Sequence, residues 1–201
     1  MKDLFITTLL LSLILVFSSC EEDETTNVTP ELSETEKSEL LYMLEEEKLA
    51  RDVYTYFDEL WGVKQFTNIK ESEKNHIGYV SATLDMYEIS YTILPEGQFD
   101  NMDIQNLYDQ FIVQGEANSL DALIVGATIE DIDIADLEEL IGTTTNSTLL
   151  ELYERLQCGA KNHMRGFVKG INNAGGSYAP QFITEQVYDE IMAAENMHCH
   201  G

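Results

Sequence analysis

Apolar side chains that recur every three or four residues are the feature that most constrains how this chain can fold. The recurrence fills most of the sequence after residue 32, and it is the spacing of an amphipathic α-helix rather than the strict alternation of a strand. Glycine and proline stand mainly at the joints between the periodic segments. The sequence therefore predicts an all-α domain over residues 33–192, with four long helices and short extra helices.

Capping signals place the ends of the first two long helices. Ser33 opens the first helix with a capping box, and Gly62 is expected to end it. A second signal of the same kind, at Asn68 and Glu71, predicts the start of the second helix. We expect this helix to continue to about Glu88.

A connection without helical periodicity separates the second long helix from the rest of the chain. The segment 91–101 contains Pro95 and Gly97, which favour turns, so we expect it to cross the bundle. A short helix follows, and Asn118 or Ser119 would cap the third long helix. The fourth long helix and a last short helix complete the predicted domain.

Ionisable side chains interrupt the apolar stripe of each long helix. A single acid in such a stripe is often a surface residue, and a single histidine is often a hydrogen-bonded core residue. Here the interruptions occur on all four helices, and two of them are pairs spaced by three, which places both members on one helical face. The candidate metal ligands are Glu47, Glu73, His76, Glu130, Asp133 and His163.

Charge decides how such a cluster could be buried. Four carboxylates in a core would cost several kcal/mol per ion without compensation, and neutral imidazoles would not offset them. Arg51 could supply one positive charge, and a hydrogen-bonded polar core around it is the purely structural alternative. Two divalent cations would supply four charges and would also explain the histidines, because oxygen and imidazole ligands suit iron, manganese and zinc.

The spacing of the candidates is similar to that of dinuclear carboxylate sites in four-helix bundles. Those sites use one Glu on each of two helices and Glu-x-x-His on the other two. The fourth helix departs from this pattern, because Ala160 stands three residues before His163. We expect Asp133 to replace the missing carboxylate, with Glu73 and Glu130 bridging two cations and the other candidates as terminal ligands.

The first 32 residues predict export and anchoring rather than a fold. Residues 1–19 contain an early lysine, a short apolar run and small residues, which is typical of a secretory signal. Cys20 follows directly, in a setting that resembles the lipobox of bacterial lipoproteins, so we expect it to be lipid-modified, with residues 20–32 as an acidic tether. The expected location is the bacterial cell envelope, at the outer membrane or cell surface. A free secreted protein is the alternative.

The net charge of the chain limits its partners. The formal charge is -26, which would repel a polyanion, because nucleic-acid affinity comes chiefly from cationic contacts to phosphate. We therefore expect no nucleic-acid partner. The partners predicted instead are the membrane, through Cys20, and a small oxidant or a metal ion, while a homodimer stays open.

The cysteines and histidines near the C-terminus allow two interpretations each. Cys158 and Cys199 could form a disulfide in an oxidising compartment or remain free thiols. The tail 193–201 offers His198, Cys199 and His200 as further metal ligands. A frayed terminus is the simpler interpretation of this tail.

Tyr54 and two glycines lie close in sequence to candidate ligands. Tyr54 could hydrogen-bond a ligand or quench an oxidised intermediate, which would make it a catalytic residue, or it could be an ordinary core tyrosine. Gly126 and Gly159 could leave room for a small oxidant or allow close packing of helices.

Several separate segments resemble the ferritin-like family catalogued as domain of unknown function 2202. They are EEEKLARDVYTYF, SEKNH, GATIEDIDIADL, KNHMRGF and YAPQFIT, spread over about residues 37–192. The first segment also resembles the first helix of rubrerythrins, which selects Glu47 as the ligand, and Glu130 with Asp133 is similar to paired acids on the third rubrerythrin helix. The resemblance implies a ferritin-like four-helix bundle with a long crossover connection.

The ligand pattern and the resemblance together predict a lipid-anchored protein with a dinuclear non-haem metal centre. Two divalent ions are expected, with iron as the leading candidate and manganese or zinc as alternatives. If the protein is an enzyme, it is a di-iron oxidoreductase such as a ferroxidase or peroxidase, acting on dioxygen, peroxide or ferrous iron. The alternative is a non-catalytic envelope lipoprotein that binds metal or a partner, because fold does not imply function.

Overall fold

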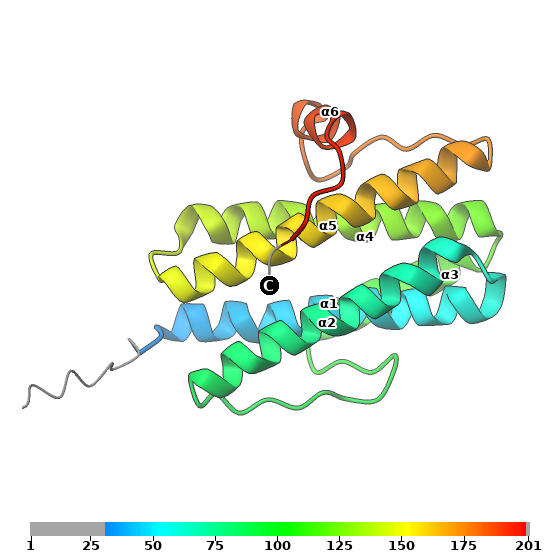
Figure 1. Cartoon of the computed structure of the whole chain (residues 1–201). Coiled ribbons are helices and arrows are strands. Elements are labelled where there is room, and N and C mark those ends of the chain that lie inside the picture. Colours follow the sequence, from blue (N-terminus) through cyan, green and yellow to red (C-terminus); the bar gives the residue numbers. More distant parts are fainter. Residues whose placement is uncertain (1–30, 200–201) are drawn as a thin grey trace, which may run out of the picture. The chain divides into compact units, whose positions relative to one another are not determined.

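The computed structural model describes residues 31–199, which contain six α-helices and no β-strand (Figure 1). The helices are α1 (Glu34–Trp61), α2 (Lys64–Met86), α3 (Met102–Gly115), α4 (Ser119–Thr143), α5 (Ser147–Asn173) and α6 (Glu185–Ala193). The predicted all-α class is confirmed. The predicted signal segment 1–19, Cys20 and most of the predicted tether lie outside the described residues. Between residues 31 and 199, no helix combines the length and the apolar character needed to cross a membrane.

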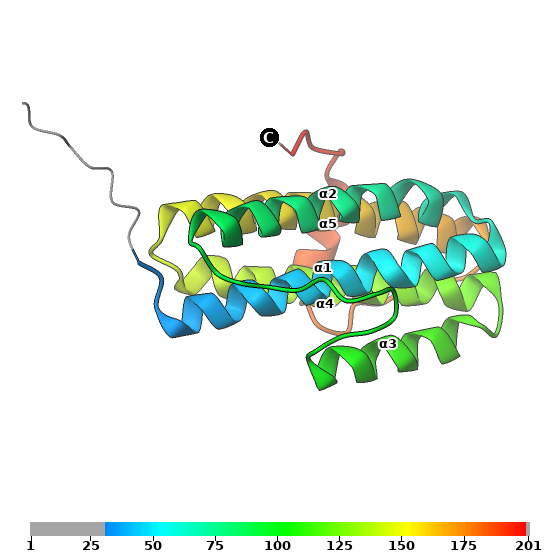
Figure 2. The ribbon, with the colours of Figure 1, turned by 90° about the horizontal axis from the view of Figure 1, so that it is seen from below.

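The four long helices lie side by side, with α1 packed along α2 and α4 packed along α5 (Figures 1 and 2). The shorter helix α3 packs against α1 and α4, and α6 contacts α5. Two large apolar clusters fill the space between the long helices. One is rich in aromatic rings, including Tyr54, Phe57, Phe66 and Phe167, and the other is mainly aliphatic, including Leu40, Met43, Leu84 and Leu149.

The ends of α1 agree with the sequence prediction. The Ser33 hydroxyl accepts a hydrogen bond from the Glu36 backbone N–H (3.2 Å), and the Glu36 carboxylate accepts one from the Ser33 backbone N–H (2.8 Å). These two bonds are the capping box. At the other end, Gly62 has a φ of 61°, a left-handed conformation that glycine adopts without steric cost.

The predicted start of α2 at Asn68 is wrong, because the helix begins at Lys64 and Val63 provides no side-chain cap. Packing explains the earlier start. Phe66 is fully buried, and its ring lies 5.6 Å from that of Phe57, measured between centroids. Burying a large aromatic ring there outweighs the local capping preference of Asn68. The helix also ends before Glu88, at Met86.

The connection between α2 and α3 runs along α1 (Figure 2). The Lys48 ammonium donates hydrogen bonds to the carbonyl oxygens of Pro95 (3.1 Å) and Gln98 (3.0 Å). The Glu45 carboxylate accepts backbone hydrogen bonds from Asp100 (2.7 Å) and Asn101 (2.8 Å), just before α3. Polar side chains of α1 therefore fix the segment that the sequence predicted to be a crossing connection.

The later helix starts also follow local signals. Asn118 is the residue that caps α4, since its side chain accepts a hydrogen bond from the Asp121 backbone N–H at 2.9 Å. Ser119 is the first residue inside that helix. The predicted domain boundary at residue 192 falls within the last turn of α6, which ends at Ala193.

A disulfide holds the C-terminal tail against α5. Cys158 and Cys199 are bonded, with an S–S distance of 2.09 Å, so the pair is not two free thiols. The Asn162 side chain also donates to the Met197 carbonyl and accepts from the Met197 backbone N–H, each at 3.0 Å. The interpretation of the tail as a frayed terminus is therefore wrong up to Cys199, and His200 lies outside the described residues.

Candidate metal centre

The predicted ligands lie between the two apolar clusters, in one layer that crosses all four long helices. On each long helix, residues of the aliphatic cluster lie on one side of the ligands and residues of the aromatic cluster on the other. Glu47, Glu73, Glu130, His76 and His163 are all buried, with exposed fractions of 2 to 8%. Each side chain reaches the layer because its position continues the apolar face of its helix.

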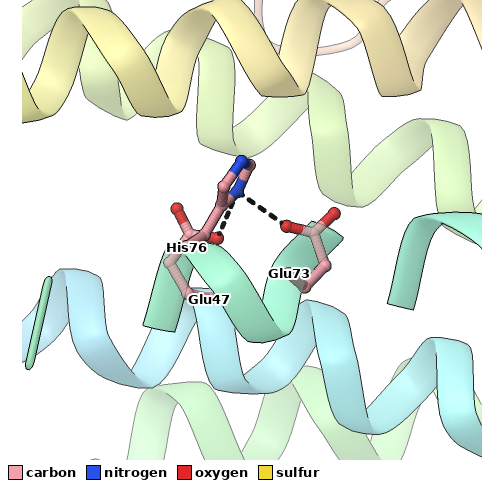
Figure 3. Close-up of side chains that lie close together, drawn as sticks. All are labelled: Glu47, Glu73 and His76. Carbon is pink, nitrogen blue, oxygen red and sulfur yellow. Dashed lines mark hydrogen bonds and ion pairs between the residues drawn. The ribbon is translucent and has the colours of Figure 1, made fainter. Parts of the chain in front are cut away.

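One group of potential ligands joins α1 and α2. It consists of Glu47, Glu73 and His76, whose nearest ligand atoms lie within 4.8 Å of one another. The Nδ1 atom of His76 is 3.1 Å from Glu47 Oε2 and 2.9 Å from Glu73 Oε2. Figure 3 shows the imidazole facing both carboxylates. Two acids and one imidazole nitrogen thus converge from two helices.

A second group joins α2, α4 and α5 and shares Glu73 with the first. It consists of Glu73, Glu130 and His163, again with ligand atoms within 4.8 Å of one another. The Nδ1 atom of His163 is 2.8 Å from Glu73 Oε1 and 3.5 Å from Glu130 Oε2. The two oxygens of Glu73 therefore face different histidines, one in each group.

Several atoms in this layer are buried without a hydrogen-bond partner. They are Glu47 Oε1, Glu73 Oε1, Asp133 Oδ1 and His163 Nδ1. His163 Nδ1 and Glu73 Oε1 are close enough for an ion pair, yet their angles do not satisfy a hydrogen bond. Unpartnered buried polar atoms are costly, and carboxylate oxygens that converge with imidazole nitrogens can be satisfied by a bound cation. The residues present therefore fit a metal site.

Asp133 lies beside the two groups without belonging to either. It lines a small cavity of about 10 Å³ together with Glu47, Glu73 and Glu130. The sequence predicted Asp133 as a substitute for the acid that Ala160 cannot provide. The structure brings it to the same cavity as the other acids but leaves its carboxylate outside both convergent sets.

Three neighbours hold the ligands in place. The Tyr54 hydroxyl donates a hydrogen bond to Glu130 Oε1 at 2.5 Å. His163 Nε2 is 2.9 Å from the Ser72 hydroxyl, so the nitrogen that points away from the acids has a partner that fixes the ring orientation. Gly159 leaves no room for a side chain, because a Cβ there would lie 2.5 Å from the His76 ring. Of the two roles considered for Gly159, the structure shows close packing.

Two features of the site depart from what the sequence suggested. Arg51 does not compensate the ligand acids, since its guanidinium pairs with Asp52, and a polar core built around Arg51 is therefore wrong. Sequence reasoning also missed Glu46, which is buried and lines the same small cavity as Asp133. Its signal was weak, because it is one residue away from the seam position Glu47.

Electrostatics distinguishes the carboxylates. Burial raises the pKa of Glu130 to about 7, against the opposing effect of His163. Burial also raises the pKa of Asp133 well above its ordinary value, and the neighbouring Glu47 and Glu130 raise it further. For Glu73, burial acts in the same direction, but the two imidazoles together move its pKa below the ordinary value. The metal-free layer thus disfavours full ionisation of its acids.

The imidazoles respond to the same acids. Burial alone would lower the pKa of His163, but Glu73 and Glu130 raise it to about 10. For His76 the result is also a raised pKa, because Glu47 and Glu73 outweigh burial. A layer with three ligand acids and two basic imidazoles attracts positive charge, and protons or metal cations could supply it.

Comparison with known proteins places the chain in a family. It is 44% identical to "Uncharacterized protein MJ0754" of Methanocaldococcus jannaschii over 165 residues. These residues are 81% of this chain and 89% of that protein. The crystal structure of the hypothetical protein MJ0754 from Methanococcus jannaschii DSM 2661 is similar, with a TM-score of 0.82 and 43% identity, covering 84% of this chain and 97% of that one. Residues 36–195 match the family described as "Uncharacterized protein domain (DUF2202)". With this match and that relative, the chain belongs to the DUF2202 family.

Proposed function

We propose that this protein is a ferritin-like four-helix bundle that binds a dinuclear metal centre, with iron as the leading ion. One observation carries the proposal: the two oxygens of Glu73 face two different histidine-containing groups. A carboxylate in this position can bridge two cations, as in the dinuclear centres of other four-helix bundles. Glu47 and His76 would hold one ion, and Glu130 and His163 the other.

The chain's own residues support such a centre in three ways. The apolar clusters on either side help to bury the ligand carboxylates, which are 2% exposed, and burial strengthens electrostatic attraction. Tyr54 positions Glu130 through its hydroxyl, and Ser72 positions His163 through Nε2. Imidazoles that are protonated in the metal-free protein release protons when they become ligands. When bound, a pair of iron ions would supply one-electron redox chemistry toward dioxygen or peroxide.

The size of the inner cavity limits the substrate. A volume of about 10 Å³ holds about one water molecule, so an organic substrate does not fit beside the acids. On the acid side of the layer, dioxygen, peroxide or the metal ion itself remains. The proposed activity is therefore oxidation of ferrous iron or reduction of a small oxidant. A centre that only stores or senses metal is the second candidate, and the small cavity favours it equally.

Elemental analysis of the purified protein tests metal binding. Wild type is expected to contain iron, manganese or zinc, and a His76→Ala/His163→Ala variant is expected to lose it. Glu154→Ala/Glu185→Ala is the control, because both residues are exposed and lie outside both groups. Wild type and the double variant with equally low or equally high metal content would refute the proposal.

Oxygen consumption separates the two candidate functions. Anaerobic metal-free protein is loaded with ferrous iron and then mixed with oxygen or peroxide. Turnover that depends on His76 and His163 assigns an oxidoreductase. A stable iron-loaded protein without turnover assigns the metal-binding protein.

We also propose that the protein is attached to the cell envelope through a lipid on Cys20. The N-terminal sequence supports this, and the Cys158–Cys199 disulfide is in keeping with a location outside the reducing cytoplasm. Small oxidants and metal ions are the partners that follow from the metal centre. We propose no nucleic-acid partner, because a formal charge of -26 would repel a polyanion.

A further inference from the structure

Three consecutive glutamates of α1 have three different environments. Glu45 accepts backbone hydrogen bonds from Asp100 and Asn101, which is a structural role. Glu47 belongs to the first ligand group. Glu46 has neither role: it is only 6% exposed, and its Oε2 atom has no hydrogen-bond partner. A buried acid with an unpartnered oxygen requires an explanation.

Glu46 lines two cavities. The outer cavity has a volume of about 660 Å³ and lies between α1 and α4, with Glu39, Asp136 and Glu139 in its wall. The inner cavity is the small one of about 10 Å³ that Glu46 shares with Glu47 and the other ligand acids. Glu46 therefore stands where the outer space meets the metal layer.

Carboxylates continue along this line from outside to inside. Glu139 is exposed and Glu39 half-buried at the outer cavity. The carboxyl groups of Glu46 and Asp136 are within hydrogen-bonding reach of each other. Asp133, whose Oδ1 atom is also unpartnered, follows at the inner cavity. Acids this close repel one another unless a proton or a cation lies between them.

We propose that Glu46 is a transit ligand that passes divalent cations from the outer cavity to the metal centre. This inference rests on the proposed function and adds the route to it. A hydrated cation is attracted by the acidic outer wall. It must exchange water for carboxylate oxygens at Glu46, because the inner cavity has room for about one water molecule.

The rate of metal loading tests the route. Metal-free protein is mixed with cobalt(II) in a stopped-flow instrument, and the absorbance of the bound ion is followed. Glu46→Gln keeps the side-chain shape and removes the charge, and it should slow loading about 10-fold, within the range by which charged clefts raise association rates. Glu154→Gln is the control, because Glu154 is exposed on α5 and lines neither cavity.

Release of the metal provides a second readout. A transit ligand changes the barrier and not the affinity, so Glu46→Gln should slow release to a chelator by the same factor and leave the final cobalt content unchanged. An unchanged loading rate would overturn the proposal. A lower final cobalt content would overturn it as well, because Glu46 would then be a ligand of the centre.

The test also separates this route from one on the histidine side of the layer. There a cavity of about 250 Å³ is lined by His76, His163 and Cys199 of the tail. If Cys158→Ser/Cys199→Ser loads faster than wild type while Glu46→Gln loads normally, the ion enters from that side and the proposal fails. Wild type that never binds cobalt contradicts the proposed function itself, which is a different result.

Discussion

Helix α1 carries buried charge in two places that differ in how completely each charge is partnered. Asp52 accepts hydrogen bonds from Lys48 Nζ (2.5 Å), Arg51 Nε (2.8 Å) and the Gly97 backbone N–H (3.0 Å). Lys48 in turn donates to two carbonyl oxygens of the connection between α2 and α3. This Lys48–Asp52 cluster leaves no unpartnered side-chain atom.

The ligand layer, within about one and a half turns along the helix, is incomplete by comparison. Glu47, Glu73 and His163 each leave a polar atom buried and unpartnered, and acids outnumber imidazoles. Both regions bury charge, so burial alone does not mark a functional site. The two regions differ in whether their buried polar atoms have partners. The Lys48–Asp52 cluster stabilises the fold as it stands, whereas the ligand layer needs a proton or a cation to be complete.

The largest expected effect tests the structural role of the Lys48–Asp52 cluster. Asp52→Asn leaves the buried Lys48 ammonium without its counter-charge, so the free energy of unfolding should fall by about 3 kcal/mol, the lower figure for breaking a buried ion pair. Urea denaturation followed by circular dichroism should give the same loss with manganese and with a chelator. Glu34→Gln, at an exposed ion pair with Lys37, should change little. A loss seen only with metal would erase the distinction between the two regions.

The second prediction concerns Glu130→Gln, whose destabilising effect should appear only when metal is present. Glu130→Gln keeps a hydrogen-bond acceptor for the Tyr54 hydroxyl but removes the Glu130 carboxyl, whose pKa is raised to about 7, chiefly by burial. At pH 8 the metal-free variant should be as stable as wild type or more stable. The stabilisation by metal, about 2.7 kcal/mol at 100 times the dissociation constant, should disappear.

Thermal unfolding with and without manganese measures the Glu130→Gln effect, and Glu138→Gln on the exposed side of α4 is its control. A Glu130→Gln variant that metal stabilises as strongly as wild type would remove Glu130 from the site.

The smallest expected effect is a change in how steeply the free energy of unfolding depends on pH. The pKa of His163 is raised from 6.5 to about 10 by Glu73 and Glu130 against the effect of burial. The folded metal-free protein thus binds a proton that the unfolded chain releases. This stabilisation is complete below pH 6.5 and is lost as pH rises toward 10, at up to about 1.4 kcal/mol per unit. The affinity of the folded protein for metal should rise over the same pH range, because the His163 imidazole must be neutral to act as a ligand.

Urea midpoints between pH 7 and pH 9.5 should therefore fall with a chelator and stay nearly level with saturating manganese, because neither the unfolded chain nor the metal-bound protein then carries the His163 proton. Parallel trends would mean that metal and protons do not compete for His163.

Periodicity along single helices accounts for what could be predicted about the site. Glu47, Glu73, His76, Glu130 and His163 could be identified because each falls on the apolar face of its own helix, and that face must be buried. Their convergence follows from the bundle that these faces require. The ends of α1 were also predictable, because a capping box and a left-handed glycine are local structures.

The errors and omissions have a different physical origin. The start of α2 was misplaced because Phe66 is held by aromatic rings from other helices. Glu46 was missed because a residue next to a seam position points about 100° away from it, in a direction where Asp133 and Asp136 of α4 line the adjacent cavities. The Cys158–Cys199 pairing depends on where the tail returns to α5, which two cysteines in a sequence do not specify.

The sequence by itself determined that Glu47, Glu73, His76, Glu130 and His163 enter the buried layer, because side-chain direction on a helix repeats with a fixed period. Only the tertiary structure decided which of the buried charges have partners. Lys48, Asp52, Glu46 and Glu47 are all within two turns of one helix, yet the first two are satisfied and the last two are not. Hydrogen bonds and ion pairs depend on atoms brought together from distant parts of the chain, and helical periodicity carries no information about those distances.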